Sequence, residues 1–213
     1  MLVQIIHPDT YKSQGDTLCM GHIPEYEERD LRVLSFLEAA LEARVGVLFH
    51  ERTEANPIST MMMKIVLKTD PIYRILDDDR IKRVSTFRSG LPLPKNGSER
   101  VDTQTWEYLL RHFTTHQEMA RAIESPRQVL FIGGLLEACL TNMACYHHDH
   151  YKPTGQDQEL LYCPELCVMG SDEVFQTIAR PELERRGIRA VGYDEAMRLV
   201  RSRAEELLPE SAS

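Results

Sequence analysis

Cys139 lies where the sequence changes from a strand pattern to a helix pattern. Residues 129–132 form a short β-branched and aromatic run that predicts a strand. Apolar residues then recur at helical spacing, at Leu136, Leu140, Met143 and Ala144. Between the two patterns, Gly133 and Gly134 predict a tight turn. Backbone N–H groups at a helix start stabilise an anion, so they lower a thiol pKa and favour the nucleophilic thiolate.

A buried structural role for Cys139 is the alternative interpretation. A cysteine on the apolar face of a helix is a common core residue, because its thiol behaves as a small hydrophobic group. The position of Cys139 favours a site, because ligands of an open α/β sheet bind outside the carboxyl ends of the strands. The strand-to-helix turns lie at that edge. Both interpretations stay open from the residues alone.

Composition predicts one domain over residues 1–213. With 213 residues, of which 42% are hydrophobic and 27% charged, the chain can bury one substantial core. No apolar run approaches the ~18 residues that span a bilayer, and no signal peptide opens the chain, so we expect a cytoplasmic protein. Five cysteines without a dense pattern indicate reduced thiols. A net charge of -8 argues against nucleic acid as a partner.

The segment of about residues 56–100 is expected to be irregular, a lid or an interface, with at least one helix and one strand inside it. The apolar residues 61–63 and 65–67 predict core or a subunit interface, and hence a homo-oligomer. Residues 80–83, RIKR, form a compact basic run directly after three aspartates. This order of charges predicts a solvated, salt-bridged face.

Strand and helix patterns alternate along the chain. We expect strands at residues 3–6, 45–49, 129–132, 159–163 and 188–191. We expect helices at residues 27–44, 105–123, from Cys139 onwards, 172–186 and 194–208. The first helix places Leu31, Leu34, Leu37 and Leu41 on one face, while Ser171 caps and Gly187 ends the helix at 172–186. The alternation predicts an α/β, Rossmann-like three-layer sandwich with a mostly parallel central sheet.

Residues 129–168 resemble the isochorismatase-like cysteine hydrolase superfamily, which includes nicotinamidases, carbamoylsarcosine amidases and isochorismatases. The resemblance is carried by matches at Gly133, Glu137, Cys139, Leu140 and the Glu165-Leu166 pair. The order of elements to Leu208 is also similar, whereas Leu136 replaces the usual threonine. The resemblance implies an isochorismatase-like fold, a small-molecule substrate, and hydrolysis of a small amide or related C–N bond by Cys139. We expect no cofactor in this chain.

The family triad of Asp, Lys and Cys is only partly matched. His7 fills the slot of the aspartate at the end of the first strand, and Asp9 follows two residues later, so either side chain is a candidate base. Lys95 is the best candidate for the lysine. Backbone N–H groups of Ala138 and Cys139 would hold the oxyanion. Because of the departures, a catalytically degenerate member that serves as a binding or assembly module is the alternative.

A histidine cluster forms a second candidate site, made of His147, His148, Asp149 and His150, with Cys145 before it and Cys163 and Cys167 after it. Its spacing matches no closed zinc module, and histidines sit well at the carbonyl end of a helix, so we predict no metal there. His112 and His116 form another pair. Some members of the resembled family bind a metal after the second strand, where this chain has His50 and Glu51.

Overall fold

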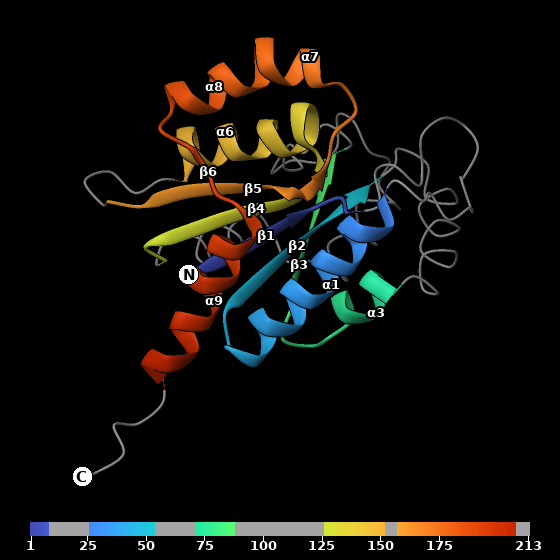
Figure 1. Ribbon diagram of the computed structural model, residues 1–213, viewed down its shortest axis with the longest axis vertical. Coiled ribbons are helices and arrows are strands. Elements are labelled where there is room, and N and C mark those ends of the chain that lie inside the picture. The colour runs from blue at the N-terminus through green and yellow to red at the C-terminus, as the bar shows by residue number, and fades with distance from the viewer. Residues whose placement is uncertain (9–25, 54–70, 88–125, 152–156, 208–213) are drawn as a thin grey trace, which may run out of the picture.

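One parallel sheet of six strands organises the molecule (Figure 1). The computed structural model describes residues 1–8, 26–53, 71–87, 126–151 and 157–207. Within these ranges the strand order is β3-β2-β1-β4-β5-β6, and every neighbouring pair is parallel. The predicted α/β class with a central, mostly parallel sheet is therefore confirmed.

Strands and helices mostly alternate among the described elements. The strands are β1 Leu2–Ile6, β2 Gly46–Thr53, β3 Lys82–Phe87, β4 Gln128–Leu135, β5 Glu159–Val168 and β6 Arg189–Ala190. The helices are α1 Glu27–Glu42, α3 Pro71–Leu76, α6 Thr141–His150, α7 Asp172–Val174, α8 Arg180–Arg185 and α9 Tyr193–Leu207. Two π-helical turns, η3 Leu136–Leu140 and η4 Phe175–Ala179, precede α6 and α8.

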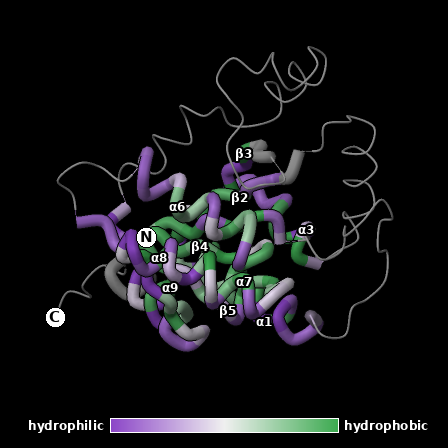
Figure 2. The backbone as a smooth tube through the Cα atoms, turned by 90° about the horizontal axis from the view of Figure 1, so that it is seen from above, coloured by the Kyte–Doolittle hydropathy of each residue, from purple (hydrophilic) through white to green (hydrophobic). Residues whose placement is uncertain are grey.

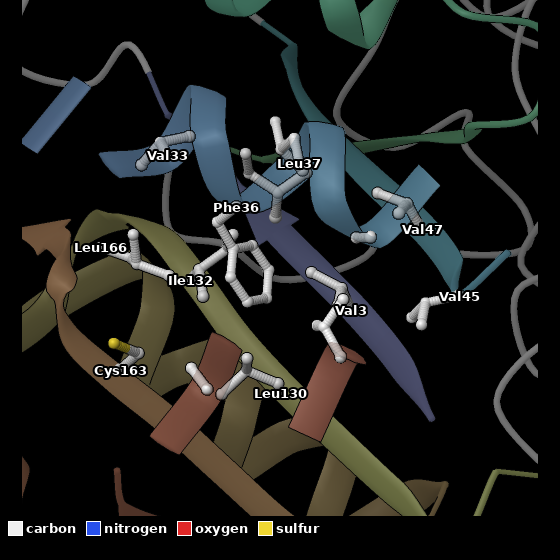
Figure 3. Packing of buried hydrophobic residues seen from close by; sticks show 14 of the residues in the cluster. Val3, Val33, Phe36, Leu37, Val45, Val47, Leu130, Ile132, Cys163 and Leu166 are labelled. Carbon is white, nitrogen blue, oxygen red and sulfur yellow. The ribbon is translucent and has the colours of Figure 1, made fainter. Parts of the chain in front are cut away.

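Helices cover both faces of the sheet, with α1, α3 and α9 on one side and α6, α7 and α8 on the other (Figure 1). Successive strand residues point to opposite faces, so β1 supplies Val3 and Ile5 to one core and Leu2 and Ile6 to the other. Figure 3 shows Phe36 of α1 among Val3 of β1 and apolar residues of β4. In Figure 2, the apolar strands lie inside and hydrophilic stretches colour the outer helices.

The predicted apolar face of the first helix is partly wrong. Leu31 is 60% exposed, whereas Leu37 and Leu41 are buried as expected. The buried stripe of α1 contains Arg29, Val33, Phe36, Leu37, Ala40 and Leu41. This stripe has helical spacing, and Leu31 lies outside it, because residue 31 falls between the positions that face the sheet. The helix also ends at Glu42, two residues before the expected end.

The glycine pair after the third predicted strand is part of β4, so the predicted turn is wrong. The strand continues to Leu135, although its pairing with β5 shifts register on both sides of Gly133. Gly133 has φ +103, and a Cβ there would lie 2.4 Å from the Ile6 carbonyl oxygen. Glycine is needed for the close approach of β4 to the end of β1. In the same way, β5 runs past its expected end at Cys163 to Val168.

The remaining described predictions about local structure are largely confirmed. The middle segment contains a helix, α3, and a strand, β3. Its charges are paired, with Arg80 on Asp78 at 2.7 Å and Arg83 on Asp77. The Ser171 hydroxyl accepts a hydrogen bond from the Val174 N–H (3.3 Å).

Several predicted features differ from the structure or lie beyond it. The helix predicted at 172–186 contains the π turn η4 and ends at Arg185, before Gly187 with φ +68. The predicted last strand is shorter, Arg189–Ala190. The helix predicted at 105–123 and the apolar residues 61–63 and 65–67 lie outside the described residues. Among the described helices, none has the length and apolar character needed to cross a membrane.

Candidate active site

Cys139 is the fourth residue of η3 and lies at the carboxyl edge of the sheet, just beyond the end of β4. Its side chain is 2% exposed, and Sγ donates a long hydrogen bond to the Leu135 carbonyl oxygen (3.8 Å). A Cβ on Gly134 would lie 2.4 Å from this Sγ. The glycine at position 134 is therefore what allows the sulfur to sit directly against the β4 backbone.

The end of β1 lies against the same glycine. The would-be Cβ of Gly134 is 2.9 Å from the Ile6 carbonyl oxygen and 3.4 Å from that of His7. His7 is fully buried, and its N–H donates to the His50 carbonyl oxygen of β2 (3.2 Å). His7 has φ +39, a left-handed backbone conformation that a non-glycine residue seldom adopts. His7, directly after β1, and Cys139, after the end of β4, therefore both lie next to Gly134.

Two predicted partners of Cys139 cannot be placed beside it. Asp9, the second candidate base, and Lys95, the candidate lysine, lie outside the described residues. The backbone N–H groups of Ala138 and Cys139 belong to the first turn of η3, where N–H groups have no partner inside the helix. The oxyanion role of these two N–H groups stays a prediction.

Glu137 fixes the site to the next loop. Its two carboxylate oxygens accept hydrogen bonds from the N–H groups of Gly170 (3.3 Å) and Ser171 (2.9 Å), which connect β5 to α7. Glu165, the other acidic match to the family pattern, has a different place. Its Oε1 accepts a hydrogen bond from the Tyr193 N–H (3.2 Å), so it caps α9 and not the Cys139 turn.

Arg29 is a buried cation near the same edge that sequence reasoning missed. Its guanidinium Nη1 donates to the Pro8 carbonyl oxygen (3.0 Å), directly after His7, and pairs with Asp30 at 2.6 Å. Burial raises the pKa of the Cys167 thiol, and the positive charge of Arg29 lowers it by a smaller amount. The signal in the sequence was its position four residues before Val33, on the buried stripe of α1.

Three other cysteines have environments that keep them protonated. Burial is the main cause that raises the pKa of Cys145, of Cys163 to about 12, and of Cys167. Glu165 beside Cys163 raises the pKa of that thiol further. The Cys167 thiol donates a hydrogen bond to the Cys163 carbonyl oxygen (3.0 Å). The raised pKa values favour the neutral thiols, which are poor nucleophiles.

A buried polar chain crosses the core on the α6 side of the sheet, and the sequence analysis did not anticipate it. His50 Nε2 is 2.8 Å from Gln4 Oε1, and Gln4 Nε2 is 3.0 Å from His147 Nδ1. His147 Nε2 is in turn 3.0 Å from Gln158 Oε1. Burial, together with the nearby His7 and His147, lowers the pKa of His50 well below 6.5, so this histidine is neutral.

The histidine cluster consists of groups with separate partners. His147 belongs to the buried chain, whereas His148 Nδ1 lies 2.8 Å from Asp149, which also pairs with Arg186 at 3.0 Å. Among the residues that the structure describes, no group of three or more His, Cys, Asp or Glu side chains is placed to hold a metal. His50 and Glu51 are both buried, and within the described ranges no third His, Cys, Asp or Glu side chain joins them to form a metal site; His112 and His116 lie outside those ranges.

Comparison with known proteins identifies the fold. No family model and no curated protein matches the sequence, but solved structures do. A protein of Oleispira antarctica named as an isochorismatase hydrolase is 12% identical, with a TM-score of 0.54 over 92% of this chain and 95% of that chain. A cysteine hydrolase from Pseudomonas syringae pv. phaseolicola 1448A is also 12% identical, with a TM-score of 0.54 over 95% and 92%.

An amidase belongs to the same group of similar structures. The N-carbamoylsarcosine amidase from Thermoplasma acidophilum is 10% identical, with a TM-score of 0.51 over 91% of this chain and 96% of that chain. At such low identity, the likeness shows a shared fold and leaves the reaction to the residues of the site. It agrees with the resemblance carried by Gly133, Glu137 and Cys139. The chain has the isochorismatase-like α/β fold of the cysteine hydrolases.

Proposed function

We propose that this protein is a hydrolase that cleaves a small amide or related C–N bond through Cys139. The observation that carries the proposal is the position of Cys139 Sγ against Gly134, next to the end of β1 and the candidate base His7. The carboxyl edge of a parallel sheet is where such folds bind ligands. Solved structures of the same fold that are named as a cysteine hydrolase and an N-carbamoylsarcosine amidase support the reaction class.

The reaction would proceed in two steps. His7 or Asp9 takes the proton of the Cys139 thiol, the resulting thiolate attacks the amide carbonyl carbon, and the protonated base gives its proton to the leaving amine. The C–N bond breaks and leaves a thioester. Water then attacks the thioester carbonyl, which releases the carboxylic acid and restores the thiol. Lys95 would stabilise the thiolate, and the N–H groups of Ala138 and Cys139 would stabilise the oxyanion.

A binding or assembly module without catalysis is the second candidate, and one observation favours it. Cys139 is 2% exposed and belongs to an apolar cluster with Leu136, Leu140 and Met143. A thiol in such surroundings serves equally well as core. The two candidates therefore differ in whether Cys139 forms a covalent bond with substrate.

Intact-protein mass spectrometry with a panel of small primary amides tests the proposal, with ammonia release measured in parallel. We expect an acyl adduct on the peptide that contains Cys139. The variant Cys139→Ser should lose about 10³-fold or more in kcat/KM. Cys145→Ser is the matched control and should retain activity, because Cys145 lies on α6, two turns of helix further on. Ammonia release that survives in Cys139→Ser would contradict the proposed nucleophile.

Failure of the whole panel would favour the binding module. In that case no amide would yield ammonia or an adduct, although the protein is folded by circular dichroism. Retention of a small molecule by the purified protein, seen by native mass spectrometry, would then support a non-catalytic role.

A further inference from the structure

The buried polar chain has a fixed direction, set at one end by a backbone carbonyl. Gln158 Nε2 lies 2.8 Å from the Pro126 carbonyl oxygen, which can only accept, so this amide nitrogen donates there. Gln158 Oε1 then accepts from His147 Nε2. The amide nitrogen of Gln4 can only donate, so His147 Nδ1, 3.0 Å away, carries no proton and accepts from Gln4 Nε2. Gln4 Oε1 accepts from His50 Nε2.

The direction of these hydrogen bonds determines which ring nitrogen of His50 carries the proton. Because Nε2 must donate to Gln4, the neutral ring carries its proton there and Nδ1 is an unprotonated acceptor. His50 is fully buried, and Nδ1 has no hydrogen-bond partner within the part of the chain that the structure describes. A buried acceptor without a partner is costly, and a functional contact to a ligand is one of the explanations for such a group in a native protein.

His50 lies at the same edge of the sheet as Cys139. Ile6, the last residue of β1, is in register with His50 on β2 and with Gly133 on β4. His7 then contacts both sides, since its N–H reaches the His50 carbonyl oxygen and its own carbonyl lies near Gly134. The chain through Gln4 and His147 also runs on the α6 side, where Cys139 lies.

We propose that His50 determines specificity at this site, by accepting at Nδ1 a hydrogen bond from the N–H of a bound amide. In this scheme Gln4, His147 and Gln158 are positioning residues, which act through His50 by holding its proton on Nε2. The substrate class follows from the acceptor: a primary amide offers an N–H, and the corresponding ester does not. This inference rests on the proposed amide hydrolysis for its substrate, but the proton position of His50 is independent of any activity.

Nitrogen-15 NMR of the unliganded protein tests the proton positions. Two-bond proton–nitrogen couplings distinguish the protonated from the bare nitrogen of each ring, and His50→Gln and His147→Gln assign the signals. We expect both rings as the Nε2–H form, with a scalar coupling across the hydrogen bond from Gln4 Nε2 to His147 Nδ1. In Gln4→Glu, a carboxylate can only accept, so His147 should move its proton to Nδ1 while His50 stays unchanged.

Substrate preference tests the role of Nδ1. His50→Gln keeps a donor at the place of Nε2, and so the bond to Gln4, but has no acceptor at the place of Nδ1. We expect kcat/KM for a small aromatic primary amide to fall about tenfold, while the matching methyl ester changes by less than about twofold. His50→Asn returns an acceptor to the place of Nδ1 and should restore part of the amide activity. Gln128→Met is the control, because the Gln128 amide pairs with Glu159, off the chain.

Each outcome decides a separate statement. A proton on Nδ1 of His50, or an unchanged His147 ring in Gln4→Glu, would overturn the positioning chain. Equal losses for amide and ester in His50→Gln, or no loss, would overturn the hydrogen bond to the substrate N–H. If the wild-type protein hydrolyses neither compound, the proposed function fails and the substrate contact fails with it, whereas the NMR result still decides the proton position.

Discussion

Replacing Gly134 by alanine tests the packing of the candidate site directly. The new Cβ would lie 2.4 Å from Cys139 Sγ and 2.9 Å from the Ile6 carbonyl oxygen. Relief of the sulfur contact alone requires a shift of about 1 Å, in a place where β1 and β4 are hydrogen-bonded neighbours. Overpacking of this kind costs about 1–3 kcal/mol. We expect Gly134→Ala to lower the free energy of unfolding by about 2 kcal/mol.

A double-mutant cycle separates the sulfur from the backbone contact. Cys139→Ala removes Sγ, so Gly134→Ala made in that background meets mainly the Ile6 carbonyl oxygen. The cost of the alanine should then fall by about 1 kcal/mol, and this difference is the coupling energy. Urea unfolding of the four proteins measures it, provided that the m-values agree.

Gly46→Ala is the matched control for a glycine in a strand. Its Cβ would meet Leu2 Cδ1 at 3.4 Å, an ordinary contact, so we expect a change within about 0.5 kcal/mol. Costs of Gly134→Ala and Cys139→Ala that add within about 0.5 kcal/mol would refute the reasoning. The sulfur would then not rest against Gly134, and the geometry that carries the proposed function would be wrong.

Further predictions concern stability and assembly. Because the pKa of His50 is lowered in the folded protein, the unfolded chain binds a proton at this residue first as the pH falls. The contribution of His50 to the free energy of unfolding is therefore constant above about pH 6.5 and decreases below it, by at most ~1.4 kcal/mol per pH unit. His50→Gln should reduce that slope in urea titrations between pH 7.5 and 5. Glu137→Ala loses two accepted hydrogen bonds and should cost about 1–2 kcal/mol, where a loss below 0.3 would contradict the anchoring of η3 to the β5–α7 loop. Gly187→Ala meets no atom within 4 Å but has φ +68, so it should cost about 1 kcal/mol and lower Tm by about 2–4 °C in a thermal melt. The apolar residues 61–63 and 65–67 predict a homodimer or larger assembly by light scattering at micromolar concentration, and a clean monomer would contradict this.

Periodicity predicted most of the fold, because it reports directly on burial. The strand at residues 129–132 and the helix residues Leu136, Leu140 and Met143 are all buried as the spacing indicates. The turn predicted from the glycine pair was wrong, since glycine often marks a turn in the sequence but here allows close contact between two strands. Whether Gly133 forms a turn or allows a neighbouring strand to approach closely depends on β1, which lies far away in the sequence.

The site was predictable only in part for a similar reason. Cys139 and His7 could be proposed because each follows a strand, and parallel strands end at one edge. The sequence around Gln4 and Gln158 does not predict their role. A polar residue inside an apolar strand, or before one, can be interpreted only when its hydrogen-bond partner across the core is known. Arg29 looked like one more charge on a polar helix start, and only the packing of α1 shows it to be buried.

The π-helical turn η3 lets the direction of the Cys139 side chain change without a change in the position of α6. A π turn corresponds to one extra residue in an α-helix, so deletion of Leu140, the η3 residue after Cys139, would restore ordinary α-helical winding. With α6 kept in place by Met143 and His147, every residue before the deletion would rotate by about 100° about the helix axis. The Cys139 side chain would then turn away from Gly134. The extra residue of the π turn is thus what places the sulfur against the β4 backbone.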